Sequence, residues 1–426
     1  MNLKTETALV CSAPLFACLA ERLARDFSKV YFCSPSGSNF PSLNHGMVGH
    51  GLENVEVVPE VFGAHFEEVG LFIFPDLHHG ALQVQLEKMG KRVWGGRHGE
   101  DFEHQRELMK RRMESLGLPV QTWKRLVGMQ ALRAHLAENE NQHVKVNRWR
   151  GLTESFFVQN LELAGEKLAD LEHSLGAFRE SFPFIVEDDL PDRVEIGLDT
   201  YCIDGAYPTR TMCGIEAKDI GYVCQVMDWP KIPEPIRRWN EKLAPAFRRV
   251  GYRGFLSNEV RIGEDHEPYM IDATTRMPSP PGELEQELIT NLAEVMWAGA
   301  AGELIEPQMA GEWGVEVILK SNFARENHQR VEVPKAVQPF VKLYNYCQVD
   351  GVQYSLSQHE DMPEIGAVVG YGKTLDEAVA MVKKIGESVE GFGVKFSLGP
   401  VDAVKEQISQ MVKIGISPFS LDSAEF

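Results

Sequence analysis

Residues 1–100 alternate between short apolar runs and amphipathic stretches. Four apolar runs predict buried strands, at 8–13, 29–35, 69–76 and 91–96. Amphipathic stretches at 14–27 and 81–90 have the spacing of helices with one apolar face. Strands and helices in alternation predict a parallel sheet with helices on its faces. The first turn lacks G-x-G-x-x-G, which disfavours a nicotinamide dehydrogenase.

A more mixed pattern follows residue 100. The stretch 101–117 predicts one charged helix, stopped by Gly117 and Pro119. Apolar or alternating runs predict strands at 120–126, 142–147, 155–160, 182–190, 194–205, 209–219, 254–263, 267–276, 313–321 and 367–372. Amphipathic stretches predict helices at 129–139, 163–178, 233–251, 283–302 and 374–391. An acidic turn joins the strands at 254–263 and 267–276, which predicts an antiparallel hairpin.

The length of the chain predicts several domains. At roughly 100–200 residues per domain, 426 residues correspond to two to four domains. The pattern divides them into four parts, at 1–100, 101–187, 188–312 and 313–426. Their fold class is α/β.

The charge and the cysteines narrow the class of protein. A net charge of −19 repels phosphate backbones and anionic lipids, so neither a nucleic acid nor a membrane is an expected partner. ATP remains compatible, because a local basic pocket with Mg²⁺ can bind a triphosphate. The seven cysteines form no C-x-x-C pair, so we expect free thiols. No apolar run reaches 18 residues, so we expect no membrane span. No basic segment precedes the apolar stretch at 8–20, so we expect a cytoplasmic protein rather than a secreted one.

Carboxylates cluster in the predicted hairpin. Asp272, Thr274 and Arg276 alternate along one strand and therefore share a face. A tight hairpin brings Glu259 of the preceding strand alongside them. Two carboxylates and a hydroxyl are the oxygen ligands that Mg²⁺ prefers, and Arg276 can hold a phosphoryl oxygen. The alternative is a solvated hairpin with charges on its exposed face.

Basic residues follow one another near residue 145. Lys145 stands between two valines on a short strand, where its ammonium group can reach ATP phosphates. Arg148 and Arg150 follow in a turn. The alternative is an edge-strand lysine followed by a solvated turn.

An apolar strand at 182–190 leads directly into acidic residues. The adenine of a nucleotide can pair with backbone groups at the end of such a strand, and a nearby carboxylate can bind the ribose hydroxyls. The alternative is a strand that ends in a charged loop.

Two further segments lie next to predicted strands. Asp76, His78 and His79 follow one strand and either contact a substrate or form a polar turn. The proline-rich stretch 277–282 follows the hairpin and predicts a rigid loop that can shape a substrate site.

The order of these features resembles the ATP-grasp superfamily. A βαβ domain is followed by a charged helix ending in G-L-P, then by V-K, I-V-E-x-x-L and N-E-V…I-D-A-T-T-R. The layout is similar to that of phosphoribosylamine–glycine ligase and the biotin carboxylases, and it covers almost the whole chain. The most specific segment, 249–276, looks like the two-strand metal motif of the family.

The resemblance implies a role for each part of the chain. It implies a pre-ATP-grasp domain at 1–100, a lid with its linker at 101–187, a core with the metal motif at 188–312, and a small α/β domain at 313–426. The implied metal ligands are Glu259, Asp272 and Thr274, and the implied catalytic residues are Glu259, Asp272 and Arg276. The residues implied to contact the nucleotide are Arg106, Lys145, Arg148, Arg150, Glu187, Leu190 and Glu195.

The sequence departs from the family pattern at several positions. R-W-R-G-L-T-E-S replaces the glycine-rich loop of the lid, so Arg148 and Arg150 would cover the phosphates. Asp272 replaces a glutamate, Thr274 an asparagine and Arg106 a lysine. The substrate signature of the glycinamide pathway is missing, and so are the biotin carboxylase lid loop and base-bearing signatures.

The activity implied by the resemblance is ADP-forming carboxylate–amine ligation with Mg²⁺ or Mn²⁺. A carboxylate would attack the γ-phosphate of ATP, and an amine or related nucleophile would capture the acyl phosphate. A homodimer is compatible with this interpretation. The alternatives are a catalytically silent ATP-binding regulator and an ATP-grasp kinase without ligation.

Overall fold

The computed structural model describes the chain except residues 35–46, 147–154, 192, 219, 358–362, 418 and 420–426, and the side chain of Asp272. The chain forms two compact units. The larger unit contains Met1–Gly99, Glu195–Asn258 and Thr274–Phe426, and the smaller contains Glu100–Val194 and Glu259–Ala273. These two units do not correspond to the four parts predicted from the sequence. The division into four parts stays a prediction.

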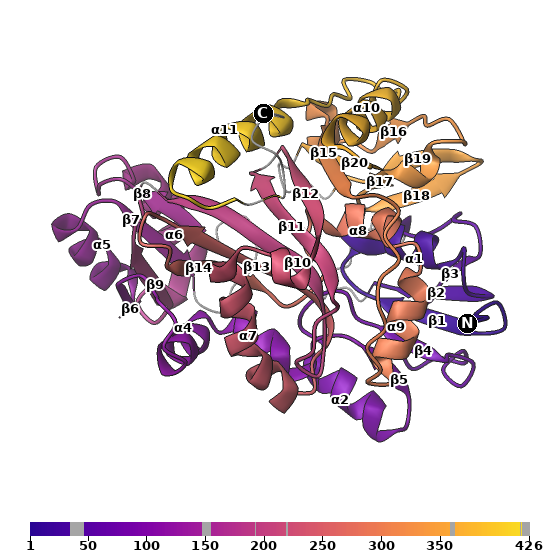
Figure 1. Ribbon diagram of the computed structural model, residues 1–426, viewed down its shortest axis with the longest axis horizontal. Coiled ribbons are helices and arrows are strands. Elements are labelled where there is room, and N and C mark those ends of the chain that lie inside the picture. The colour runs from indigo at the N-terminus through magenta and orange to yellow at the C-terminus, as the bar shows by residue number, and fades with distance from the viewer. Residues whose placement is uncertain are drawn as a thin grey trace. The chain divides into compact units, whose positions relative to one another are not determined.

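The N-terminal part of the larger unit is the predicted parallel sheet (Figure 1). Its strand order is β3-β2-β1-β4-β5. The strands are β1 (Thr7–Cys11), β2 (Lys29–Cys33), β3 (Val55–Val57), β4 (Leu71–Ile73) and β5 (Arg92–Trp94). Helices α1 (Ala17–Leu23) and α2 (Gly80–Lys88) connect strands of this sheet, and apolar side chains are buried on both of its faces. Sequence analysis missed β3, since three residues are too few for an alternating pattern.

An eight-stranded sheet with order β14-β13-β10-β11-β12-β15-β20-β17 follows. Its strands are β10 (Val194–Ile203), β11 (Arg210–Ala217), β12 (Gly221–Asp228), β13 (Arg253–Ile262), β14 (Pro268–Thr274), β15 (Trp313–Lys320), β17 (Val341–Leu343) and β20 (Glu364–Gly372). Strands β13 and β14 run from one unit into the other.

Helices and a small sheet complete the larger unit. The helices are α7 (Glu234–Arg249), α8 (Gly282–Leu288), α9 (Leu292–Ala300), α10 (Leu375–Gly386) and α11 (Gly399–Lys413). The small sheet has the order β16-β19-β18 and consists of β16 (Gln329–Val331), β18 (Tyr346–Val349) and β19 (Val352–Ser355).

The smaller unit is built on a four-stranded antiparallel sheet with order β6-β9-β7-β8. Its strands are β6 (Trp123–Val127), β7 (Gln142–Val146), β8 (Ser155–Val158) and β9 (Pro183–Asp188). Its helices are α3 (Asp101–His104), α4 (Arg106–Ser115), α5 (Met129–Glu138) and α6 (Gly165–Leu175). Leucines of α5 and α6 share one apolar core with the sheet, beside which Figure 1 shows both helices.

Two predicted helices are each divided in two. The stretch 101–117 forms α3 and α4, because Gln105 leaves the helical region with φ −106° and ψ 76°. The stretch 283–302 forms α8 and α9. Ile289 is extended and bridges Met309, while the amide of Thr290 donates to the carbonyl oxygen of Gln308 at 2.8 Å. Backbone pairing with a distant segment replaces the local helix there.

The seven cysteines are all buried as free thiols, as the sequence predicts. Within the described ranges, no helix has the length and apolar character needed to span a membrane.

Candidate nucleotide site

The sheet of the smaller unit has one apolar and one polar face. Val144 and Val146 of β7 and Phe184 and Val186 of β9 belong to the core beneath the helices. Strand alternation therefore places His143, Lys145, Ile185 and Glu187 on the opposite face. Their register is direct, because Lys145 pairs with Ile185 and His143 pairs with Glu187. Two strands thus present basic and acidic groups side by side.

Lys145 is buried on this polar face and joins it to the predicted metal strand. Its Nζ donates to the carbonyl oxygen of Ile271 at 2.8 Å and lies 3.4 Å from Glu187 Oε2. Ile271 is the residue before Asp272. The lysine predicted to bind phosphate therefore lies beside the backbone that carries a predicted metal ligand.

Helix α4 brings two more basic residues to the same face. Arg106, Met109, Lys110 and Met113 are its buried residues, with the spacing of a single helix face. Arg106 Nη1 donates to the carbonyl oxygen of Val146 at 2.8 Å, at the end of β7. Lys110 Nζ lies 3.0 Å from Glu187 Oε1 and donates to Gln121 Oε1 at 2.7 Å.

Three buried cations belong to this site. Arg106, Lys110 and Lys145 are buried, and the ammonium groups of both lysines lie within 3.4 Å of Glu187. A local basic cluster is compatible with a triphosphate, although the whole chain is strongly acidic. The donor set therefore fits the phosphates of ATP.

A second set of polar residues lies at the end of β9. His143 Nε2 lies 2.9 Å from Asp189 Oδ1, and Arg261 Nη1 of β13 lies 3.6 Å from the same oxygen. Burial opposes ionisation of Asp189, but hydrogen bonds from His143 and the Leu190 amide, with the charge of Arg261, lower its pKa. The ring of His143 also lies 5.1 Å from that of Phe157. This group adjoins Glu187 and Leu190, the predicted adenine-binding residues.

Sequence analysis missed Lys110, His143, Asp189 and Arg261. Local signals existed for three of them. Lys110 lies one helical turn after Arg106, His143 two strand positions before Lys145, and Arg261 two positions after Glu259. No local sequence pattern predicts that Asp189 contacts both His143 and Arg261.

The predicted metal residues lie on neighbouring strands. Glu259 is a half-buried residue of β13, and Thr274 is the last residue of β14. Arg276 lies two residues beyond the end of β14, so strand alternation does not extend to it; its Nη1 donates to the Met277 carbonyl oxygen at 3.1 Å.

The metal assignment stays a prediction. Over the described residues, no group of three or more His, Cys, Asp or Glu side chains is arranged to hold a metal ion. The predicted set has only two carboxylates, and the side chain of Asp272 is outside the description.

The remaining predicted residues are distributed as follows. Leu190 follows β9 in the smaller unit, and Glu195 lies in β10 within the larger unit. Arg148 and Arg150 lie outside the described residues.

Comparison with known structures identifies the fold. Phosphoribosylamine–glycine ligase from Thermotoga maritima aligns with a TM-score of 0.67 and 15% identity, over 92% of this chain and 98% of that chain. The biotin carboxylase domain of Hydrogenobacter thermophilus 2-oxoglutarate carboxylase, a dimer with MgADP, ADP and bicarbonate, gives a TM-score of 0.66 and 13% identity over 98% and 99%. Biotin carboxylase from Campylobacter jejuni, in complex with βγ-ATP, gives 0.63 and 15% over 92% of each chain.

The chain has the ATP-grasp fold.

The ATP-grasp fold confirms the expectation from motif order, including the N-terminal parallel sheet. The likeness lies in the fold, because no family model and no curated protein matches the sequence. Solved structures of this fold include the nucleotide-bound carboxylases above.

Proposed function

We propose that this ATP-grasp protein is an ADP-forming carboxylate–amine ligase that uses Mg²⁺ and proceeds through an acyl phosphate. The hydrogen bond from Lys145 Nζ to the Ile271 carbonyl oxygen carries the proposal. It joins the predicted phosphate lysine to the predicted metal strand, across 126 residues of sequence. The likeness to known ligases supports the class of reaction.

Each predicted nucleotide-binding or catalytic residue has a role in this proposal. Arg106 and Lys145 hold the phosphates of ATP, and Arg148 and Arg150 cover them. Glu187 and Leu190 contact the adenine, and Glu195 contacts the ribose. Arg276 stabilises the charge that develops at the transferred phosphoryl group, so that catalysis is mainly electrostatics and positioning.

The oxygen donors of Glu259, Asp272 and Thr274 suit a hard divalent cation, Mg²⁺ or Mn²⁺. When bound, such an ion neutralises phosphate charge and orients the nucleotide.

The test is release of ADP and phosphate from Mg·ATP across a panel of carboxylates and amines. Under the proposal, one pair stimulates ADP release and forms an amide, and Asp272→Asn and Glu259→Gln each abolish turnover while the fold stays intact. Circular dichroism of both variants checks the fold.

Other outcomes would favour the alternatives. A phosphorylated product without an amide would indicate a kinase. Nucleotide binding without turnover for any pair would favour a regulator, and wild-type turnover in Asp272→Asn would refute the metal site. A cytoplasmic location and a homodimer stay predictions.

A further inference from the structure

Two buried carboxyl groups bond to each other in the larger unit. Glu283 is the second residue of α8, and Glu316 lies in β15. Both side chains have 0% exposure, and the two carboxyl groups form a hydrogen bond. Each oxygen of such a pair needs a hydrogen-bond partner from the protein, because water does not reach it.

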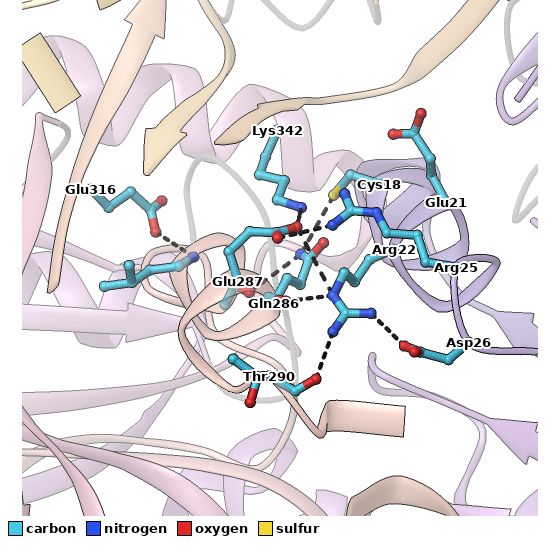
Figure 2. Close-up of polar contacts among 12 residues, drawn as sticks. Cys18, Glu21, Arg22, Arg25, Asp26, Gln286, Glu287, Thr290, Glu316 and Lys342 are labelled. Atoms are coloured by element: carbon cyan, nitrogen blue, oxygen red, sulfur yellow. Dashed lines mark hydrogen bonds and ion pairs between the residues drawn. The ribbon is translucent and has the colours of Figure 1, made fainter. Parts of the chain in front are cut away.

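The donors around this pair satisfy only half of its oxygens. Ser279 Oγ donates to Glu283 Oε1 at 2.8 Å, and the Leu284 amide donates to Glu316 Oε2 at 3.1 Å; Figure 2 shows the contact at Glu316. Among the described residues, no donor outside the pair reaches Glu283 Oε2 or Glu316 Oε1. Ionised carboxylates only accept, so one proton between the two groups is needed for their hydrogen bond.

The surroundings decide which group keeps that proton. Burial, reinforced by the charge of Glu283, raises the pKa of Glu316 well above its usual range. Burial also raises the pKa of Glu283, but the Ser279 hydroxyl and the charge of Lys342 oppose that rise. Glu316 is therefore the acid and Glu283 the carboxylate.

The pair is connected to Arg276 through the segment 277–282. The amide of Met277 donates to the carbonyl oxygen of Pro75 at 2.8 Å, and Arg276 donates to the carbonyl oxygen of Met277. Further along, Ser279 bonds Glu283 and also lies 3.4 Å from the hydroxyl of Tyr344. The segment behind Arg276 is thus fixed at Met277 and again at Ser279.

We propose that Glu283 and Glu316 share one proton and act through Ser279 as positioning residues, holding Arg276 for chemistry at the transferred phosphoryl group. The positioning role rests on the proposed ligase function, whereas the shared proton does not.

Two substitutions of Glu316 test the positioning role. Glu316→Gln keeps a donor for Glu283 and an acceptor for the Leu284 amide, whereas Glu316→Met keeps neither. We expect Glu316→Gln to retain kcat within about twofold, and Glu316→Met to lower kcat by about 10–100-fold without changing the KM for ATP. Glu285→Gln is the control for removing a buried acid from the same helix, because the charge of Glu283 acts on Glu285 but no hydrogen bond joins Glu285 to the pair. Equal kcat in Glu316→Met and wild type, or equal losses in both Glu316 variants, would overturn the role.

Infrared spectroscopy tests the shared proton without any turnover. The carbonyl stretch of a protonated carboxylic acid absorbs separately from the bands of a carboxylate. The infrared difference spectrum between wild type and Glu316→Gln at neutral pH should therefore show the loss of one carboxylic acid band. A difference spectrum that shows only a lost carboxylate would overturn the shared proton. Loss of the acid band in the Glu316→Gln difference spectrum, together with no turnover in the wild-type protein, would support the pair and contradict the ligase function.

Discussion

Lys145 is the residue on which nucleotide binding depends most directly. Replacing it with alanine removes a charged donor from a buried polar face. A hydrogen bond to a charged group contributes about 1.5–3 kcal/mol, so we expect Mg·ATP affinity to fall by about 10–100-fold in Lys145→Ala. Isothermal titration calorimetry measures the change. Lys124→Ala is the control, because Lys124 is an exposed residue of the same sheet; an unchanged affinity in Lys145→Ala would remove Lys145 from the site.

The buried acid Glu285 is one group that makes stability depend on pH. Burial, then the charges of Asp199 and Glu283, raises the pKa of Glu285 well above its ordinary value of 4.5. The folded state holds this proton more tightly than the unfolded state. Its contribution to stability is therefore complete below about pH 4.5 and is lost as pH rises towards the folded pKa.

Glu285→Gln should remove the part of the pH dependence that Glu285 contributes. Between about pH 6 and pH 8, the free energy of unfolding of the variant should fall less than that of wild type, by up to about 1.4 kcal/mol per pH unit. Urea denaturation at both pH values measures the difference, with exposed Glu303→Gln as the control. Parallel pH curves for wild type and Glu285→Gln would contradict the assignment.

At the scale of elements, α8 connects α1 to the strand β17. Figure 2 shows Glu287 of α8 between Lys342 of β17 and Arg25. Lys342 Nζ lies 2.5 Å from Glu287 Oε1, and Arg25 Nη1 lies 2.9 Å from Glu287 Oε2. Arg22 of α1 donates to the carbonyl oxygens of Gln286 and Thr290. A short helix thus anchors segments that are far apart in sequence.

Removing one partner from this group should be more harmful than removing both. Lys342 and Glu287 are 3% and 9% exposed, so Lys342→Met leaves a buried carboxylate with Arg25 as its nearest cation. We expect a loss of about 3 kcal/mol in the free energy of unfolding, and recovery of most of it in Lys342→Met/Glu287→Gln. Urea denaturation measures both variants. A double variant no more stable than Lys342→Met would show that the charge is not the cause.

At the scale of the whole molecule, ligand binding should leave a regional pattern of protection. The polar face belongs to the smaller unit, so saturating Mg·ATP should slow amide hydrogen exchange most in α4, β7 and β9. Strands β1 and β2 of the larger unit serve as the internal reference. Mass spectrometry of peptides from these strands and helices provides the measurement. Protection spread equally over both units would argue against a nucleotide site on this face.

Most of the order of helices and strands follows from local sequence pattern, and so does the placement of the basic residues of β7 and α4. Alternation alone places Lys145 on a face away from Val144 and Val146, because backbone geometry sends successive strand residues to opposite sides. Helical spacing likewise brings Lys110 next to Arg106. The motif order indicates the ATP-grasp fold, since it is a pattern of local elements along the chain.

Contacts between distant segments decide the rest. The bond from Lys145 to Ile271 joins residues separated by 126 positions, and nothing near either residue specifies it. The break between α8 and α9 depends on pairing with Met309, and the proton of Glu316 depends on burial against Glu283. Local periodicity reflects backbone geometry, whereas pairing, burial and protonation depend on which surfaces exclude water once the chain has folded.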